Sequence, residues 1–190
     1  MRAMPAGFSG VHNCGRRLSA ALVAGSAMAL AGCGADLGQS LQVNAVTGYE
    51  ASSAFSPTGH SVAALADGRY RITATGSSST PKSRVEKIAI ARAAEFGAEQ
   101  KKKFFQTSVP QTSIRCRRRD YIERGEKKML PIAGYSVVEL DVTYADIGGD
   151  PSFRPVKDTV EALKAELASE VVADDARNQA AADVRAQCGG

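Results

Sequence analysis

The feature that most constrains the fold is the alternation of apolar and polar residues from Val138 to Tyr144, within a long strand predicted from Tyr135 to Ala145. Val138, Leu140, Val142 and Tyr144 face one way, and Glu139, Asp141 and Thr143 face the other. A period of two is typical of a β-strand that has one face on a core and the other in water. The chain therefore needs a sheet that is covered on one side.

Three other segments predict further strands of this sheet. Asp67-Gly68 is a hairpin turn signal, because both residue types tolerate positive φ, and residues 70–74 alternate directly after it. Residues 104–109 are β-prone and end at a proline, and residues 113–122 predict another strand.

Two segments have helical periodicity. Ser83 and Glu86 form a capping box, so we expect a helix to begin near Arg84, with Lys87, Glu95 and Glu99 also on its wetter side. A second apolar stripe recurs every three or four residues after Pro155, at Val156, Val160, Leu163, Leu167 and Val171. The alanine-rich run 173–186 is expected to continue that helix.

These elements predict an α+β fold, with a largely antiparallel sheet of four or five strands, one helix packed on it and a long C-terminal helix. We expect one domain, over residues 61–172, because 190 residues suit a single core with appendages. Residues 33–60 are rich in small and polar types and predict a flexible tether. Residues 173–190 predict a helical or frayed tail.

The N-terminal segment has the parts of an export signal. Arg16 and Arg17 precede an apolar stretch of 12 residues, from Leu18 to Ala29, and small residues lead to Cys33. The stretch is short for a membrane span. One alternative is a transmembrane helix, since the uncharged run continues to Ala35, although several glycines weaken it. Another is a buried core helix, which would leave the positions of the charges and of Cys33 to chance.

Leu30-Ala31-Gly32-Cys33 resembles the lipobox of bacterial lipoprotein precursors. The resemblance implies that residues 1–32 are a signal peptide and that Cys33 receives a diacylglyceryl group, is cleaved from Gly32 and is acylated again, for example with palmitate. Two or three acyl chains would anchor the chain firmly to a membrane. Because Gly34 stands where an inner-membrane retention signal would have aspartate, the analogy favours the outer membrane, facing the periplasm. Translation could start at Met1 or Met4.

A second resemblance covers residues 70–105. "YRITATGSSST" followed by "IARAAEFGAEQKKKFF" is similar to a segment shared by small uncharacterised bacterial envelope lipoproteins, with Gly76, Thr80 and Arg92-Ala93-Ala94-Glu95 carrying the match. That group often has a glycine and an aromatic residue where this chain has Lys101 and Lys102. It implies no activity.

Two cysteines remain after the predicted cleavage. An oxidising envelope favours a disulfide between Cys116 and Cys188. The alternative is a free thiol at Cys188 and, at Cys116, a thiol made more acidic by its arginine neighbours. Spacing alone leaves both open.

The charge pattern argues against a nucleic-acid partner. Arg2, Arg16 and Arg17 precede Cys33, and the rest of the chain holds 21 basic and 20 acidic residues. Three basic clusters stand out, at Lys101–Lys103, at Arg115, Arg117, Arg118 and Arg119, and at Lys127-Lys128. They are either solvated faces or, if the sheet gathers them, a surface for lipid phosphates, lipopolysaccharide or another envelope polyanion.

No pattern predicts catalysis, a metal or a cofactor. His60, the only histidine after Cys33, has no nucleophile motif around it, and His60, Cys116 and Cys188 are too dispersed for a zinc site. Glu139 and Asp141 share a strand face, where solvated charges are more common than a catalytic pair. We therefore expect a non-enzymatic envelope lipoprotein, a structural or protein-interaction module, or alternatively a module that binds anionic envelope components.

Overall fold

The computed structural model describes residues 45–189, so Cys33 and the lipobox lie outside the described residues. The chain is α+β, as predicted. Within the described part, no helix is both long and apolar enough to span a membrane. The elements in order are β1 (Gly59–Ala64), β2 (Tyr70–Gly76), α2 (Lys82–Glu99), β3 (Phe104–Thr107), β4 (Gln111–Glu123), β5 (Glu126–Ala145), β6 (Arg154–Pro155), α3 (Val156–Ser169) and α4 (Asp174–Cys188).

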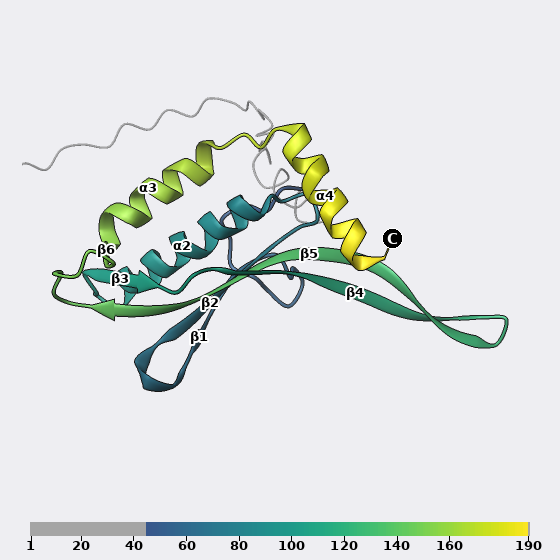
Figure 1. Cartoon of the computed structure of the whole chain (residues 1–190), viewed down its shortest axis with the longest axis horizontal. Coiled ribbons are helices and arrows are strands. Elements are labelled where there is room, and N and C mark those ends of the chain that lie inside the picture. The colour runs from purple at the N-terminus through teal and green to yellow at the C-terminus, as the bar shows by residue number, and fades with distance from the viewer. Residues whose placement is uncertain (1–44, 190) are drawn as a thin grey trace, which may run out of the picture. The chain divides into compact units, whose positions relative to one another are not determined.

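The strands form one antiparallel sheet around the long strand β5 (Figure 1). The order is β1-β2-β5-β3-β6, and β4 also pairs with β5. β3 and β4 follow each other along the same edge of β5, at residues 142–145 and 126–139 respectively. The sheet has six strands where four or five were predicted, and one of these, β6, has only two residues.

The core lies between one face of the sheet and α2. The alternating residues of β2 and β5 point inward, and Ile72, Ala74, Val138, Leu140 and Val142 are fully or almost fully buried against Val85, Ile88 and Ala89 of α2. α3 packs on α2, with Val156 and Leu167 buried, so the helices form a second and a third layer over this face (Figure 1). The core is mainly aliphatic, and Phe105 is its one fully buried aromatic side chain.

The hairpin of β4 and β5 extends beyond the rest of the sheet. β2 pairs with β5 only as far as Ser136, so residues 115–135 form a two-stranded ribbon, which we call the arm (Figure 1). Arg124 and Gly125 make its turn with φ values of 53° and 82°. A register shift between Arg117 and Arg118 marks a bulge.

The start of α2 differs from the prediction. The helix begins at Lys82 with Pro81 as its N-cap, and no side chain caps it, so Ser83 and Glu86 form no capping box. Proline already has the φ that a helix start needs, which moves the boundary upstream. Arg84 is buried rather than exposed, because its guanidinium bonds the backbone oxygens of Thr47 and Leu167.

The predicted long C-terminal helix is two helices. α3 ends at Ser169, and Glu170 is extended, with φ −68° and ψ 115°. The β-branched pair Val171-Val172 disfavours helix here, and Glu170 is held by Arg84 and Lys87 of α2. As a result Val171, predicted to lie on the apolar stripe, is 92% exposed.

Residues 45–60, which composition assigned to a tether, lie on the folded body. The Thr47 amide donates to Thr80 Oγ1 at 2.9 Å, and Ser77 N donates to Thr47 Oγ1 at 2.9 Å. Tyr49 docks on α2 through a hydrogen bond to Glu95, whereas Phe55 is fully exposed. The ordered body therefore extends upstream of the boundary predicted at residue 61.

Candidate functional site

The arm separates the predicted arginine cluster into two faces. Cys116 is joined to Cys188 of α4, so it points to the helix side of the sheet, and its neighbours in the strand point the other way. The face of the arm away from the helices, the helix-free face, therefore carries Arg115, Arg117, Arg119 and Tyr121 from β4. On the same face, β5 contributes Tyr135, Leu130 and Lys128, which lie across from Arg115, Arg119 and Tyr121 respectively. Arg118 lies on the opposite face, next to Pro131.

The three arginines of the helix-free face are exposed and unpaired. Within residues 45–189, Arg115, Arg117 and Arg119 make no ion pair. The lysines of the arm differ, since Lys127 pairs with Asp120 at 2.7 Å and Lys128 with Glu123 at 2.5 Å. The arginines thus keep their charge available to a ligand.

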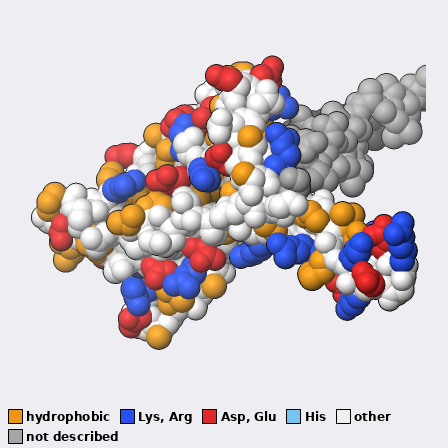
Figure 2. Space-filling model, turned by 45° about the vertical axis from the view of Figure 1, so that its right-hand side comes forward, with side chains coloured by type: hydrophobic (Ala, Val, Ile, Leu, Met, Phe, Trp, Pro, Cys, Tyr) orange, Lys and Arg blue, Asp and Glu red, His pale blue; other side chains and the backbone are white. Residues whose placement is uncertain are grey.

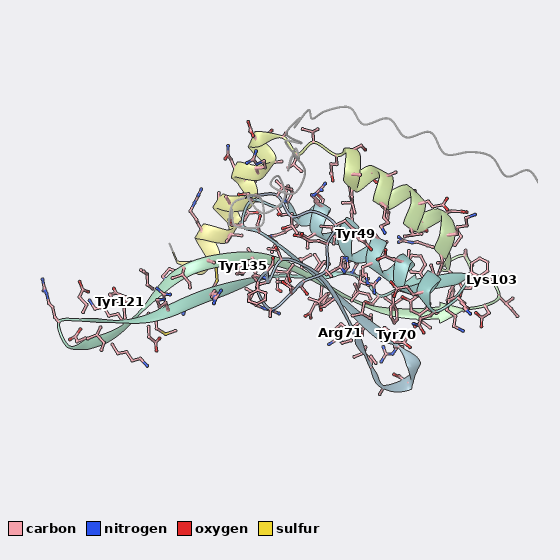
Figure 3. The ribbon with its side chains drawn as sticks, turned by 180° about the vertical axis from the view of Figure 1, so that it is seen from behind. Tyr49, Tyr70, Arg71, Lys103, Tyr121 and Tyr135 are labelled. Atoms are coloured by element: carbon pink, nitrogen blue, oxygen red, sulfur yellow. A yellow bond between two sulfur atoms is a disulfide. The ribbon has the colours of Figure 1, made fainter. Side chains whose placement is uncertain are left out.

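The sheet does not gather all the basic clusters. Lys103 and its neighbours lie at the end of the sheet opposite the arm (Figure 3), and Lys102 is paired with Asp146 at 2.9 Å. The arm alone holds seven basic and three acidic residues, which leaves 14 basic and 17 acidic residues elsewhere after Cys33. The positive charge of the domain is therefore concentrated on this ribbon.

Large apolar side chains are also exposed on the arm. Figure 2 shows hydrophobic side chains among the Lys and Arg side chains of this region. Five of the nine exposed large hydrophobic residues in the described part belong to the arm, namely Tyr121, Ile122, Met129, Leu130 and Ile132. Sequence reasoning identified the charges and missed these residues, since it did not predict that the strands extend beyond the core. One sequence signal could have indicated this exposed ribbon, namely that apolar residues stand on both sides of the charged turn at Arg124-Gly125.

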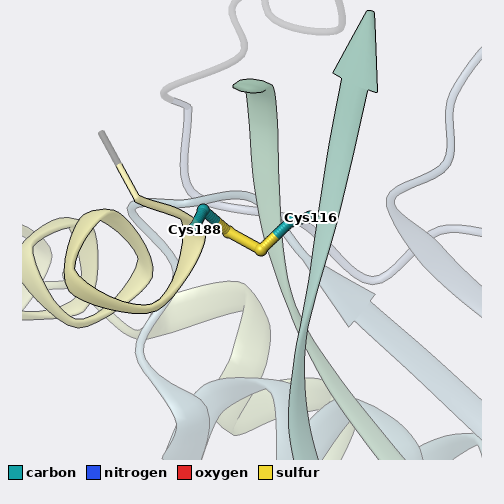
Figure 4. Close-up of a disulfide and its surroundings, with 2 residues drawn as sticks. All are labelled: Cys116 and Cys188. Carbon is teal, nitrogen blue, oxygen red and sulfur yellow. A yellow bond between two sulfur atoms is a disulfide. The ribbon is translucent and has the colours of Figure 1, made fainter. Parts of the chain in front are cut away.

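A disulfide fixes the base of the arm to α4 (Figure 4). The Cα atoms of Cys116 and Cys188 are 5.5 Å apart, and Val184 of α4 covers Gly134 of β5. Of the two alternatives left open by the sequence, the structure has the pair. Both thiolates are consumed by this bond, so they provide no zinc ligands.

His60 lies in a structural network rather than beside a nucleophile. It is 8% exposed in β1, and its ring packs against the ring of Tyr49 in a tilted arrangement, with 4.7 Å between the ring centroids. Burial, and then the charge of Arg92, lower the pKa of His60 below its ordinary value, so the ring is neutral at pH 7. Tyr49 in turn donates a hydrogen bond of 2.7 Å to Glu95, which fastens the segment before β1 to α2.

The possible carboxylate pair of β5 is an ion pair instead. Asp141 accepts hydrogen bonds from the Arg71 guanidinium at 2.8 and 3.2 Å, and this arginine lowers the pKa of Asp141. Arg69 approaches the same carboxylate at 3.7 Å. Among residues 45–189, no three His, Cys, Asp or Glu side chains are grouped so that they could hold a metal ion.

Comparison with protein-family models, with curated proteins and with solved structures gave no match. The inference to function therefore depends on the residues of the chain itself. The arm is its most distinctive surface.

Proposed function

We propose that this chain is a lipid-anchored lipoprotein of the cell envelope that acts as a non-enzymatic interaction module. The lipobox-like sequence at Cys33 supports the anchor, and small uncharged neighbours suit the cleavage that would expose it. The acyl chains would hold the chain in the outer membrane, with the folded body in the periplasm. The arm supports the interaction role, because it exposes apolar side chains on a ribbon outside the core.

Mass spectrometry of the mature chain tests the anchor. A diacylglyceryl thioether on Cys33, together with loss of residues 1–32, is the expected result. A Cys33→Ala chain should keep its signal segment and leave the outer-membrane fraction. An unmodified thiol at Cys33 in a cleaved chain would overturn this part of the proposal.

Site-specific crosslinking in intact cells tests the interaction role. A photoreactive side chain at Met129, which is 60% exposed on the arm, should give a discrete crosslinked species. The same group at Val171, 92% exposed outside the arm, is the matched control. Equal products from both positions would argue against the arm as a specific contact surface.

A second candidate function is binding of an anionic envelope component. The observation that favours it is the row of three exposed arginines on one face of the arm, which make no ion pair with any of residues 45–189. Replacing Arg117, Arg118 and Arg119 with glutamine should weaken sedimentation with anionic vesicles or lipopolysaccharide. Unchanged sedimentation would remove this candidate.

A further inference from the structure

The arginines of the helix-free face form a regular row. Alternate residues of a strand are about 6.7 Å apart, so Arg115, Arg117 and Arg119 span roughly 13 Å along β4. Each guanidinium presents a planar fork of N–H donors that matches phosphate oxygens. With no carboxylate paired to them in the described part, several phosphates could be bound side by side.

Apolar side chains lie next to this row on the same face. Leu130 is directly opposite Arg119 across the ribbon, and Tyr121 follows Arg119 by two residues. Leu130 is 51% exposed and Tyr121 is 38% exposed. Cations beside an aromatic and an aliphatic side chain are typical of segments that lie at a membrane–water interface.

The charged turn and the unpaired strand edges of the arm limit how deeply it could enter a membrane. Its turn carries Glu123, Arg124 and Glu126, and burying these charges in hydrocarbon would be costly. The edges of the ribbon beyond Ser136 have no partner strand in the described part, so their backbone groups need water or headgroups. The arm therefore suits a flat position among headgroups and not insertion by its tip.

The length of chain between the predicted anchor and the folded body allows a bilayer to reach the arm. Ala45 accepts a hydrogen bond from Ser77 Oγ, and the neighbouring Gly76 pairs with Ser136 at the base of the arm. Cys33 is 12 residues upstream of Ala45, a span of at most about 40 Å in an extended chain. Leu130 is six residues from Ser136, or about 20 Å along β5. One membrane could hold both the lipid and the arm.

We propose that the helix-free face of the arm lies on the surface of an anionic phospholipid bilayer, with Arg115, Arg117 and Arg119 on lipid phosphates and Leu130 and Tyr121 at headgroup level. This inference deepens the second candidate function and rests on it. A bilayer is favoured over a protein partner because the excess positive charge is confined to the arm and only 12 residues separate the predicted anchor at Cys33 from Ala45. Each Lys or Arg near an anionic surface strengthens binding about fivefold.

The absence of tryptophan from the chain permits a direct test. Leu130→Trp places an indole on the helix-free face, and Met129→Trp places one on the opposite face, one residue away. The chain that remains after the predicted cleavage, prepared without acyl chains on Cys33, is mixed with vesicles of phosphatidylcholine alone or with phosphatidylglycerol added, and some lipid acyl chains are brominated. Only the Leu130→Trp chain in the anionic vesicles should show a blue-shifted emission that bromine quenches.

Charge variants in the Leu130→Trp chain complete the test. Arg115→Gln, Arg117→Gln and Arg119→Gln together should abolish the blue shift and lower vesicle affinity about 100-fold. Arg118→Gln, on the other face, should leave the blue shift in place. Thiol counting checks in each variant that Cys116 and Cys188 remain bonded, and these exposed arm positions lie outside the core.

Three outcomes would overturn the proposal: equal emission from the two indoles, a blue shift that persists in the triple variant, or a blue shift that requires native membranes containing proteins. The last would indicate a protein partner. The vesicles are added to the protein, so this experiment does not need a lipid on Cys33, and mass spectrometry tests that lipid separately.

Discussion

At the scale of single residues, Gly134 decides how closely α4 approaches the arm. A Cβ atom at this position would overlap Val184 Cγ1 and lie 3.0 Å from Cys188 Sγ. The disulfide limits how far α4 can move away, so the overlap has little room to relax. Gly134→Ala should lower the free energy of unfolding by about 1–3 kcal/mol, as measured by urea denaturation.

Gly48→Ala is the matched control for this change, because a Cβ there meets no atom within 4 Å. It should leave stability nearly unchanged. If Gly134→Ala behaved like the control, the close contact between α4 and β5 would be wrong.

Glu95 makes the stability of the fold depend on pH in the acid range. Burial alone would raise the pKa of Glu95, but hydrogen bonds from Lys164, Tyr49 and Arg92 outweigh it and lower the pKa to about 2. The carboxylate therefore stabilises the fold above its unfolded pKa of about 4.5, and this contribution is lost as the pH falls toward 2. In Glu95→Gln, stability should be lower at pH 7 and should fall less between pH 5 and pH 2.

Chemical denaturation at several pH values measures this effect. Glu161→Gln, on an exposed position of α3, supplies the control for the loss of one carboxylate. Identical pH profiles for Glu95→Gln and the unchanged chain would contradict the assignment.

At the scale of elements, the disulfide determines the stability of α4. Only three residues of this helix are buried, Ala180, Val184 and Cys188, so its contact area is small. Closing a loop of 72 residues by a disulfide is worth about 4 kcal/mol from chain entropy. Cys188→Ser should release α4, seen as faster hydrogen exchange in residues 174–188, while β2 and α2 stay protected.

Reduction of the unchanged chain is the companion measurement, because it breaks the same bond without changing Cys188 to serine. It should reproduce the exchange pattern of Cys188→Ser. Full protection of α4 after reduction would mean that packing alone holds the helix.

The sequence predicted those elements whose periodicity matches their burial. The alternation in β2 and β5 and the stripe of α2 identify the core because both come from contact with one apolar layer. Element ends were harder to predict. α2 begins at a proline N-cap and α3 ends where Glu170 meets Arg84, a partner 86 residues away that local patterns do not contain. The arm was missed for a related reason, since alternation cannot show where a sheet loses its covering helix.

At the scale of the whole folded unit, Arg84 joins three parts of the chain. Its guanidinium, on α2, donates to Thr47 O at 3.1 Å, to Leu167 O at 3.1 Å and to Glu170 Oε2 at 2.6 Å. These partners belong to the segment before β1, to α3 and to the residue that follows α3. A buried guanidinium stabilises the fold when each of its donor groups has an acceptor. Removing this side chain leaves those buried acceptors without a hydrogen-bond partner.

Arg84→Met keeps most of the buried volume and removes all three bonds. We expect stability to fall by about 3 kcal/mol, because Thr47 O and Leu167 O lose their charged donor and Glu170 keeps only Lys87. Hydrogen exchange should rise together in residues 45–50 and at the C-terminal end of α3, and remain unchanged in the arm, which shares none of these bonds. Arg185→Met, on an exposed position of α4, controls for the loss of a positive charge. If only one of the two segments exchanged faster, the two would be held independently. Arg84 would then not couple the stability of residues 45–50 to that of α3.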